Sequence, residues 1–109
     1  MHLEVGTEAF GSATVVDVAG ELDLHTAGDL DAALQQARGA QTLVVDLARV
    51  DFMDSTGLSV IVSAIAAARQ DGGTIRVVTA SDKITKVFTL TGVDQQVDMF
   101  GTREEALAG

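Results

Sequence analysis

The residues that could do chemistry gather in one short segment, Asp54-Ser55-Thr56-Gly57, directly before a strongly periodic apolar stretch. This position is typical of a helix N-terminus, where backbone N–H groups lack partners inside the helix and the helix dipole is positive. Two uses are open. In a structural one, Asp54 or Ser55 caps the helix and Gly57 lets its first turn pack closely. In a functional one, the Ser55 hydroxyl carries a phosphate, which those N–H groups and the dipole would favour.

Ser55 is the preferred acceptor of such a phosphate, and Thr56 is its rival. The β-branched side chain of Thr56 can instead turn inward or bond to the preceding turn. A phosphate would add about −1.5 to −2 charges next to Asp54, so repulsion would compete with the helix dipole. We therefore expect phosphorylation to be tolerated by the fold and to change what the surface binds.

The elements that must position this segment follow from apolar periodicity and from turns. The clearest helix has Leu58, Ile61, Val62 and Ile65 at i, i+3, i+4 and i+7. Four or five strands are expected, at residues 3–5, 14–18, 42–47, 74–79 and, as a short last strand, 97–100. The helix starts are expected at Thr26 (with Asp29 as an imperfect capping box), Asp54 or Ser55, Ser81 or Asp82, and Thr102; the stops at Gly39, Gly72-Gly73 and Gly92. The third helix is expected to pack through Ile84, Val87, Phe88 and Thr91.

The order of elements is therefore β-β-α-β-α-β-α-β-α. Strands that alternate with helices favour parallel pairing through right-handed crossovers, here after an antiparallel opening hairpin. We expect residues 1–109 to form one α/β domain, a mixed β-sheet of four to five strands packed with about four helices. With four Phe and no Trp or Tyr, its core must rest on Val, Leu, Ile and Ala.

Composition excludes several classes of function. The chain has no Cys, which rules out a disulfide framework, a thiol nucleophile and cysteine-ligated metals. Its longest apolar run, residues 64–68, is far below the roughly 20 residues of a membrane helix, and its start lacks the features of a secretory signal. A soluble, cytoplasmic protein is expected.

Charge is unevenly placed along the chain. The net charge is −9, and residues 1–54 hold 10 acidic against 2 basic side chains. An acidic domain repels phosphate backbones, so nucleic-acid binding is disfavoured and a basic protein partner is expected. The alternative, that the charge serves solubility alone, stays open.

Enzymatic chemistry has little support in the sequence. Neither His2 nor His25 has further ligands at a spacing that would suggest a metal site. Ser55, His25 and Asp23 invite comparison with a hydrolase triad, but the chain lacks the Gly-x-Ser-x-Gly elbow. No glycine-rich phosphate loop supports a nucleotide-binding module. We expect no catalytic residues, no metal and no enzyme activity.

Several segments together resemble one family. Met53-Asp54-Ser55-Thr56-Gly57-Leu58 resembles the phosphorylation-site motif of bacterial anti-sigma factor antagonists, which are single STAS domains. Three further stretches look like consecutive parts of that family: residues 20–27, the central strand at 43–47, and the third helix with its glycine exit at 81–93. Two departures, Asp82 where the family often has Pro and Ser59 where Gly is frequent, leave the switch motif intact.

The resemblance implies partner switching. The unmodified antagonist binds an anti-sigma factor that is also a serine kinase with a histidine-kinase-like ATP site, and this frees the sigma factor. The kinase then phosphorylates the serine matching Ser55, the complex dissociates, and a metal-dependent serine phosphatase resets it. The chain itself would need no cofactor and would be a monomer that forms heterocomplexes. The partner-binding residues expected on this basis are Glu21, Asp23, His25, Thr26, Asp54, Ser55, Thr56, Gly57 and Ser59.

Two other protein classes share this outline. A response-regulator receiver would need a pair of acids after the first strand and a Lys after the last one, and the sequence supplies neither there. A STAS subunit of a membrane transporter or lipid-transport assembly would have the same fold and a different partner, a membrane-associated ATPase or permease.

Overall fold

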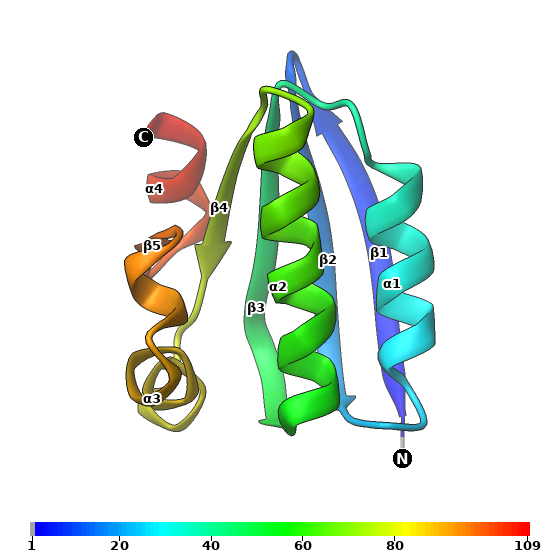
Figure 1. The fold of residues 1–109 in the computed structure, drawn as a ribbon, viewed down its shortest axis with the longest axis vertical. Helices are drawn as coiled ribbons and strands as arrows, with labels where there is room; N and C mark the ends of the chain where they lie inside the picture. The colour runs from blue at the N-terminus through cyan, green and yellow to red at the C-terminus, as the bar shows by residue number, and fades with distance from the viewer. Residues whose placement is uncertain (1) are drawn as a thin grey trace.

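A five-stranded sheet forms the middle layer of the molecule. The computed structural model describes residues 2–109, and within them the sheet has the order β1-β2-β3-β4-β5. The β1–β2 pair is antiparallel, and β2–β3, β3–β4 and β4–β5 are parallel (Figure 1). The strands are β1 Leu3–Phe10, β2 Ala13–Leu22, β3 Thr42–Met53, β4 Thr74–Val78 and β5 Asp98–Phe100. The mixed sheet with an opening hairpin is confirmed.

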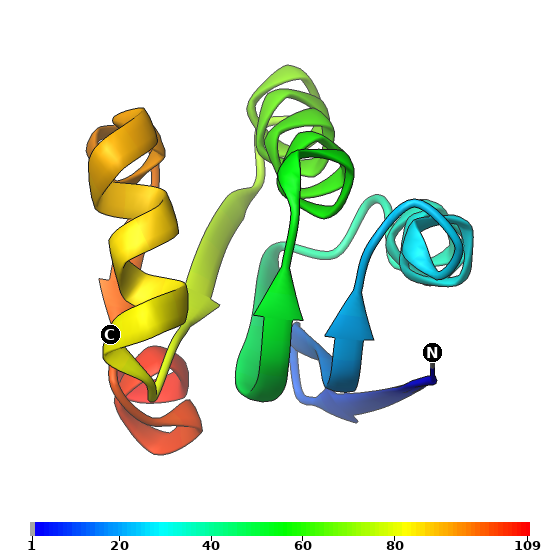
Figure 2. The ribbon, with the colours of Figure 1, turned by 90° about the horizontal axis from the view of Figure 1, so that it is seen from below.

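Helices cover the two faces of the sheet unequally. The helices α1 Ala27–Gln36, α2 Ser55–Gln70 and α3 Asp82–Thr91 lie on one face, and α4 Arg103–Ala108 lies on the other (Figure 2). A short 3-10 helix, η1 Val93–Gln95, follows α3. The expectation of about four helices is confirmed for the described residues.

The main core lies between the sheet and the three-helix layer, and it is built from aliphatic side chains, as expected. Leu58, Ile61 and Ile65 of α2 are buried there, so the periodicity of this helix is confirmed. Phe88 of α3 is the one aromatic residue of the described chain that is completely buried. A smaller cluster under α4 joins Val15, Val44, Val78 and Ala106 on the opposite face.

Several element ends differ from the expected ones. The strands β2 and β3 run on to Leu22 and Met53, well beyond the apolar runs that predicted them. The helices α1 and α2 end at Gln36 and Gln70, two to three residues before the expected glycines. Thr91 is exposed rather than packed, and its hydroxyl donates to the carbonyl of Val87 at 2.6 Å.

Three of the expected helix caps are present. The carboxylate of Asp54 caps α2, the hydroxyl of Ser81 caps α3, and that of Thr102 caps α4. Gly92 ends α3 with φ of 79°, a left-handed conformation that glycine adopts without a steric cost. Because the Asp54 cap fixes the start of α2, the position of Ser55, its first residue, is well defined.

Candidate functional site

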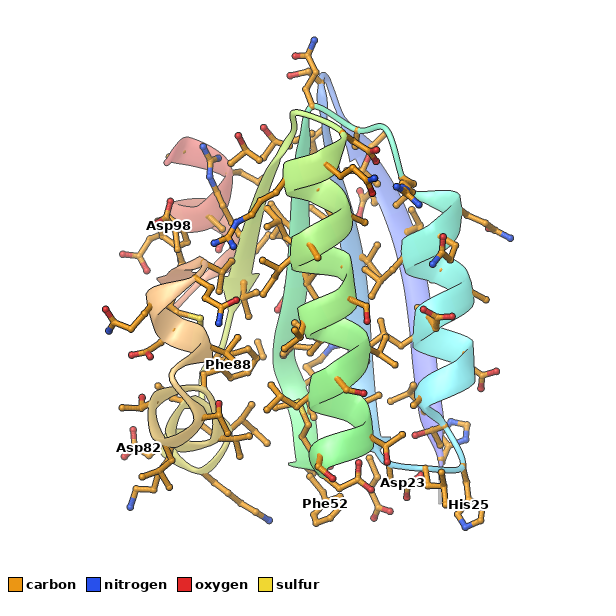
Figure 3. All side chains as sticks on the ribbon, viewed as in Figure 1. Asp23, His25, Phe52, Asp82, Phe88 and Asp98 are labelled. Atoms are coloured by element: carbon orange, nitrogen blue, oxygen red, sulfur yellow. The ribbon has the colours of Figure 1, made fainter. Side chains whose placement is uncertain are left out.

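The candidate site lies where β2 and β3 end. Leu22 and Met53 are partners in the parallel pairing, and the Asp54 N–H donates to the Leu22 carbonyl at 3.1 Å. The loop into α1 and the start of α2 therefore leave the sheet side by side. Figure 3 shows Asp23, His25 and Phe52 together at this lower end of the molecule.

The start of α2 is held by a cap and by a close contact. The Asp54 carboxylate accepts a hydrogen bond from the Gly57 N–H at 3.0 Å. A Cβ on Gly57 would lie 2.6 Å from the Leu22 Cγ, so only glycine lets α2 approach the end of β2 this closely. Both structural expectations for this segment, a cap and a close approach, are confirmed.

Three hydroxyl side chains lie in the first two turns of α2 at different depths. Ser55 is exposed at the first helical position, and Thr56 is half-buried. Ser59, one turn later, is exposed and donates to the Thr56 carbonyl at 3.1 Å. Of the two candidate phosphate acceptors, Ser55 is the more accessible.

The loop before α1 is ordered by Asp23 and Thr26, both of which are buried. The Asp23 Oδ1 accepts from the backbone N–H groups of His25 and Thr26, at 2.9 and 3.2 Å. The Thr26 hydroxyl donates to the Glu21 carbonyl at 2.7 Å and accepts from the Asp23 N–H at 3.0 Å. These bonds tie the loop to the last residues of β2.

Thr26 is the residue before α1, but the expected side-chain cap is absent. Its hydroxyl is already engaged with Glu21 and Asp23, and its φ and ψ of −110° and −15° are helical rather than extended. The imperfect capping box with Asp29 does not form for the same reason. The bond to the Glu21 carbonyl, five residues earlier, therefore engages the hydroxyl that the sequence pattern assigned to the cap.

Asp23 lies at the expected end of the sheet but does not face solvent. Its side chain is buried, and neither its Oδ2 nor the Glu21 Oε2 has a hydrogen-bond partner among the described residues. The exposed groups of this loop are instead Leu24, 70% exposed, and His25. The negative charge of Asp23 is thus a fixed part of the site, and the loop offers an apolar side chain for contact.

Two exposed apolar residues at this end were missed in the sequence, Leu24 and Phe52. Phe52 is 39% exposed and its neighbour Asp51 is exposed too, whereas Met53 is buried in the core, so the end of β3 does not alternate strictly. Leu24 stands between two polar residues and belongs to no apolar periodicity. For Leu24, the available signal was a single apolar residue in a polar loop; for Phe52, at the irregular end of β3, spacing offered no such signal.

The arrangement does not support triad chemistry. Asp23 holds the backbone of His25, and within residues 2–109 no hydrogen bond links the imidazole to Ser55. In the same residues no three His, Cys, Asp or Glu side chains come together as metal ligands. No helix of this described part is long and apolar enough to cross a membrane.

Fold and site together define a class: a small mixed-sheet α/β domain of STAS type with an exposed serine at the start of its second helix. The family model described as "Mlab, STAS domain" matches residues 5–101. An anti-sigma-B factor antagonist of Staphylococcus aureus is 34% identical over 95 residues, covering 85% of this chain and 88% of the relative. The chain belongs to the STAS-domain family of anti-sigma factor antagonists.

Solved structures agree with this assignment. An anti-sigma factor antagonist from Mycobacterium paratuberculosis superposes with a TM-score of 0.92 at 28% identity, covering 98% of this chain and 92% of the other. The Bacillus cell fate determinant SpoIIAA in its phosphorylated form gives a TM-score of 0.75 at 26% identity, covering 96% and 97%. The family resemblance found in the sequence is confirmed.

Proposed function

We propose that this chain is an anti-sigma factor antagonist that works by partner switching. Its unphosphorylated form binds an anti-sigma factor serine kinase and releases the sigma factor, and phosphorylation of Ser55 ends that binding. The observation that carries the proposal is the exposed Ser55 at the first position of α2, beside the loop ordered by Asp23. The existence of a solved relative, SpoIIAA, in a phosphorylated form supports it.

The first turn of α2 suits a phosphate without rearrangement. Its hydrogen bonds engage the N–H groups of Gly57, through the Asp54 carboxylate, and of Leu58, through the Asp54 carbonyl. The N–H groups of Ser55 and Thr56 remain at the positive end of the helix dipole, where a phosphate is favoured. The fold should therefore persist after phosphorylation, and the change is confined to the surface.

The surface change is large for a partner. A phosphate adds about −1.5 to −2 charges where the fixed charges of Asp23 and Asp54 already lie. A partner surface arranged for a neutral hydroxyl would then bury an unpaired charge or be pushed away. A loss of about 3 kcal/mol weakens binding more than a hundredfold.

The expected partner-binding residues divide into two roles. We assign direct contact to the exposed ones, His25, Ser55 and Ser59, and to the exposed side of Thr56. We assign positioning to the buried or bonded ones, Glu21, Asp23, Thr26, Asp54 and Gly57, which fix the loop and the start of α2.

Other parts of the proposal follow the family. Residues 1–109 act as a single STAS domain, monomeric until it joins the partner in the cytoplasm. ATP and Mg²⁺ belong to the kinase, and a serine phosphatase removes the phosphate. The chain itself acts as a regulator and catalyses no reaction.

The site of phosphorylation is tested with the purified chain, the cognate anti-sigma factor kinase and MgATP. We expect intact-mass analysis to show the addition of one phosphate, and fragmentation to place it on Ser55. The variant Thr56→Ala should be phosphorylated like the wild type, and Ser55→Ala should not. Phosphate on Thr56 alone would refute the assignment.

Binding is tested by titration calorimetry against the same kinase. Ser55→Ala should keep the affinity of the unmodified chain and stay bound when ATP is added. Ser55→Asp should bind at least tenfold more weakly, since one carboxylate imitates part of the phosphate charge. Unchanged affinity of Ser55→Asp would count against the mechanism. Capture by a membrane ATPase or permease, without any binding to the kinase, would favour the transport-assembly alternative.

A further inference from the structure

The outer face of α3 carries a stripe of three exposed side chains, Lys83, Lys86 and Leu90, and one, Val87, that is partly buried against the core. Lys83, Lys86, Val87 and Leu90 follow one another at i, i+3, i+4 and i+7, so they lie on one side of the helix. Ile84 and Phe88 point the other way, into the core. Leu90 is 78% exposed, and the stripe lines a shallow surface depression together with Asp82.

The two lysines of this stripe are positively charged side chains of the described chain that have no acidic partner. They are the only two lysines of a chain with net charge −9, and within residues 2–109 neither has an acidic side chain within 4.0 Å. Each arginine, in contrast, bonds to a carboxylate or a backbone carbonyl. These pairs are Arg38 with Asp71, Arg49 with Asp17, Arg69 with the Gln96 carbonyl, Arg76 with the Ala106 carbonyl, and Arg103 with Asp46.

The stripe extends toward the end of the sheet that bears Ser55. The Lys83 ammonium lies 5.6 Å from the centre of the Phe52 ring, within the range of a cation–π interaction. Phe52 is 39% exposed and precedes the Asp54 cap by two residues. Figure 3 shows Phe52 and Asp82 at the same lower end of the molecule. We call Phe52, Lys83, Lys86, Val87 and Leu90 together the α3 stripe.

We propose that the α3 stripe binds an acidic amphipathic helix of a protein partner. Exposed Leu90 and Phe52 provide apolar area for the hydrophobic side of such a helix, and the two lysines provide opposite charges for its acidic side. The rest of the surface is acidic, so a helix rich in Glu or Asp is attracted here and repelled elsewhere. The proposal does not depend on Ser55. It adds a second contact surface, which favours an acidic partner, to the Ser55 end of the molecule, where a basic partner is expected.

The test uses the full-length chain, labelled with ¹⁵N and titrated with a synthetic amphipathic peptide of Leu and Glu. We expect saturable shifts of the amide signals of residues 83–90 and of Phe52. The same peptide with Lys in place of Glu should cause none.

Matched variants separate the stripe from overall charge. K83Q/K86Q should weaken peptide binding at least tenfold, while Q35E/Q36E, at the exposed end of α1, reaches the same net charge and should keep it. L90S, which changes no charge, should also weaken binding. Each variant should keep the far-UV circular dichroism of the wild type, because these side chains are exposed.

Several outcomes would overturn the proposal. They are the absence of saturable shifts, equal binding of the Lys peptide, or equal losses in K83Q/K86Q and Q35E/Q36E. Stripe-dependent binding to phosphatidylglycerol vesicles, or stripe-dependent self-association in sedimentation, without peptide binding would replace it with a lipid surface or a second copy. None of these outcomes bears on Ser55 phosphorylation, which the mass and binding experiments test separately.

Discussion

At the scale of single residues, the site depends on one missing side chain. Gly57 is buried against the end of β2, where a Cβ would meet the Leu22 Cγ at 2.6 Å and the Leu22 carbonyl oxygen at 3.0 Å. We expect Gly57→Ala to destabilise the protein by about 1 to 3 kcal/mol, because helix and strand must separate. Urea denaturation measures the change, and the displaced α2 should also weaken binding to the kinase.

A second glycine is the matched control for this substitution. A Cβ on Gly28, in the first turn of α1, would meet nothing within 4 Å. We expect Gly28→Ala to be neutral or to stabilise by up to about 1 kcal/mol, since alanine favours the helix. Equal destabilisation by both substitutions would mean that the contact with Leu22 is not the cause.

The cap of α2 is the other residue on which the position of Ser55 depends. The Asp54 carboxylate bonds to the Gly57 N–H at 3.0 Å, and Asp54→Ala removes this bond. We expect a loss of about 1 kcal/mol in unfolding free energy. Asp54→Ser should recover most of it, because serine also caps well; no recovery would assign the effect to the charge of Asp54 rather than to capping.

At the scale of elements, the features that could be predicted from the sequence are those determined by residues close together in the chain. The α2 periodicity from Leu58 to Ile65 and the stop at Gly92 follow from positions a few residues apart, and both are confirmed. The ends of β2 and β3 were placed too early, because their last residues alternate irregularly. The register shifts of β2 against β3, around Asp17–Ala19 and Gly20–Glu21, break that alternation. Pairing between distant strands fixes these ends.

The same distinction holds for the candidate site. Asp54, Ser55 and Gly57 belong to one helix start, so their spacing was enough to predict a cap, an exposed hydroxyl and a close approach. The role of Thr26 could not be predicted, since it bonds to Glu21 across the loop. The burial of Asp23 likewise follows from how the loop folds over the sheet end, which spacing does not encode.

The fourth helix is attached to the sheet by an ion pair. The Arg103 Nε donates to the Asp46 Oδ2 at 3.0 Å, and the side chain of Asp46 is only 8% exposed. The hydrogen bond to Asp46 raises the pKa of Arg103 above its usual value, against the opposing effect of burial, so this residue stays charged. We expect Arg103→Met to destabilise by about 2 to 4 kcal/mol, since it leaves a buried carboxylate without its partner.

The double variant R103M/D46L provides the control for this pair. It removes both charges, so it should recover much of the stability that Arg103→Met loses. Thermal unfolding of the two variants measures this. A double variant no more stable than the single one would assign the loss to the other carboxylates that Arg103 contacts, Asp17 at 3.2 Å and Glu8 at 3.7 Å.

An exposed ion pair joins the C-terminal ends of α1 and α2. Arg38 bonds to Asp71 at 2.9 Å, and this hydrogen bond lowers the pKa of Asp71. A lowered pKa means that the pair contributes stability above the ordinary Asp pKa of about 4 and loses it as the pH falls through the folded value. The difference in Tm between wild type and Arg38→Gln should thus be small at pH 7, because the pair is exposed, and vanish at low pH. A difference that grows on acidification would refute the linkage.

At the scale of the whole molecule, charge placement matters more than its sum. Residues 1–54 hold 10 of the 16 acidic side chains, and phosphorylation of Ser55 would take the net charge from −9 to about −11. A basic partner should be steered toward the Ser55 end through long-range attraction. If so, the association rate constant for the kinase should fall about tenfold between roughly 0.05 and 0.5 M NaCl, with a smaller change in dissociation.

Two variants of equal net charge decide whether position has this effect. D29N/D51N removes two exposed acids near the starts of α1 and α2, whereas D98N/E104Q removes two exposed acids of β5 and α4. Stopped-flow association at low salt should be slower for D29N/D51N and nearly unchanged for D98N/E104Q, because steering depends on charges close to the contact. Equal association rate constants for the two variants, or a rate constant that does not change with salt concentration, would contradict steering and favour solubility as the role of the negative charge.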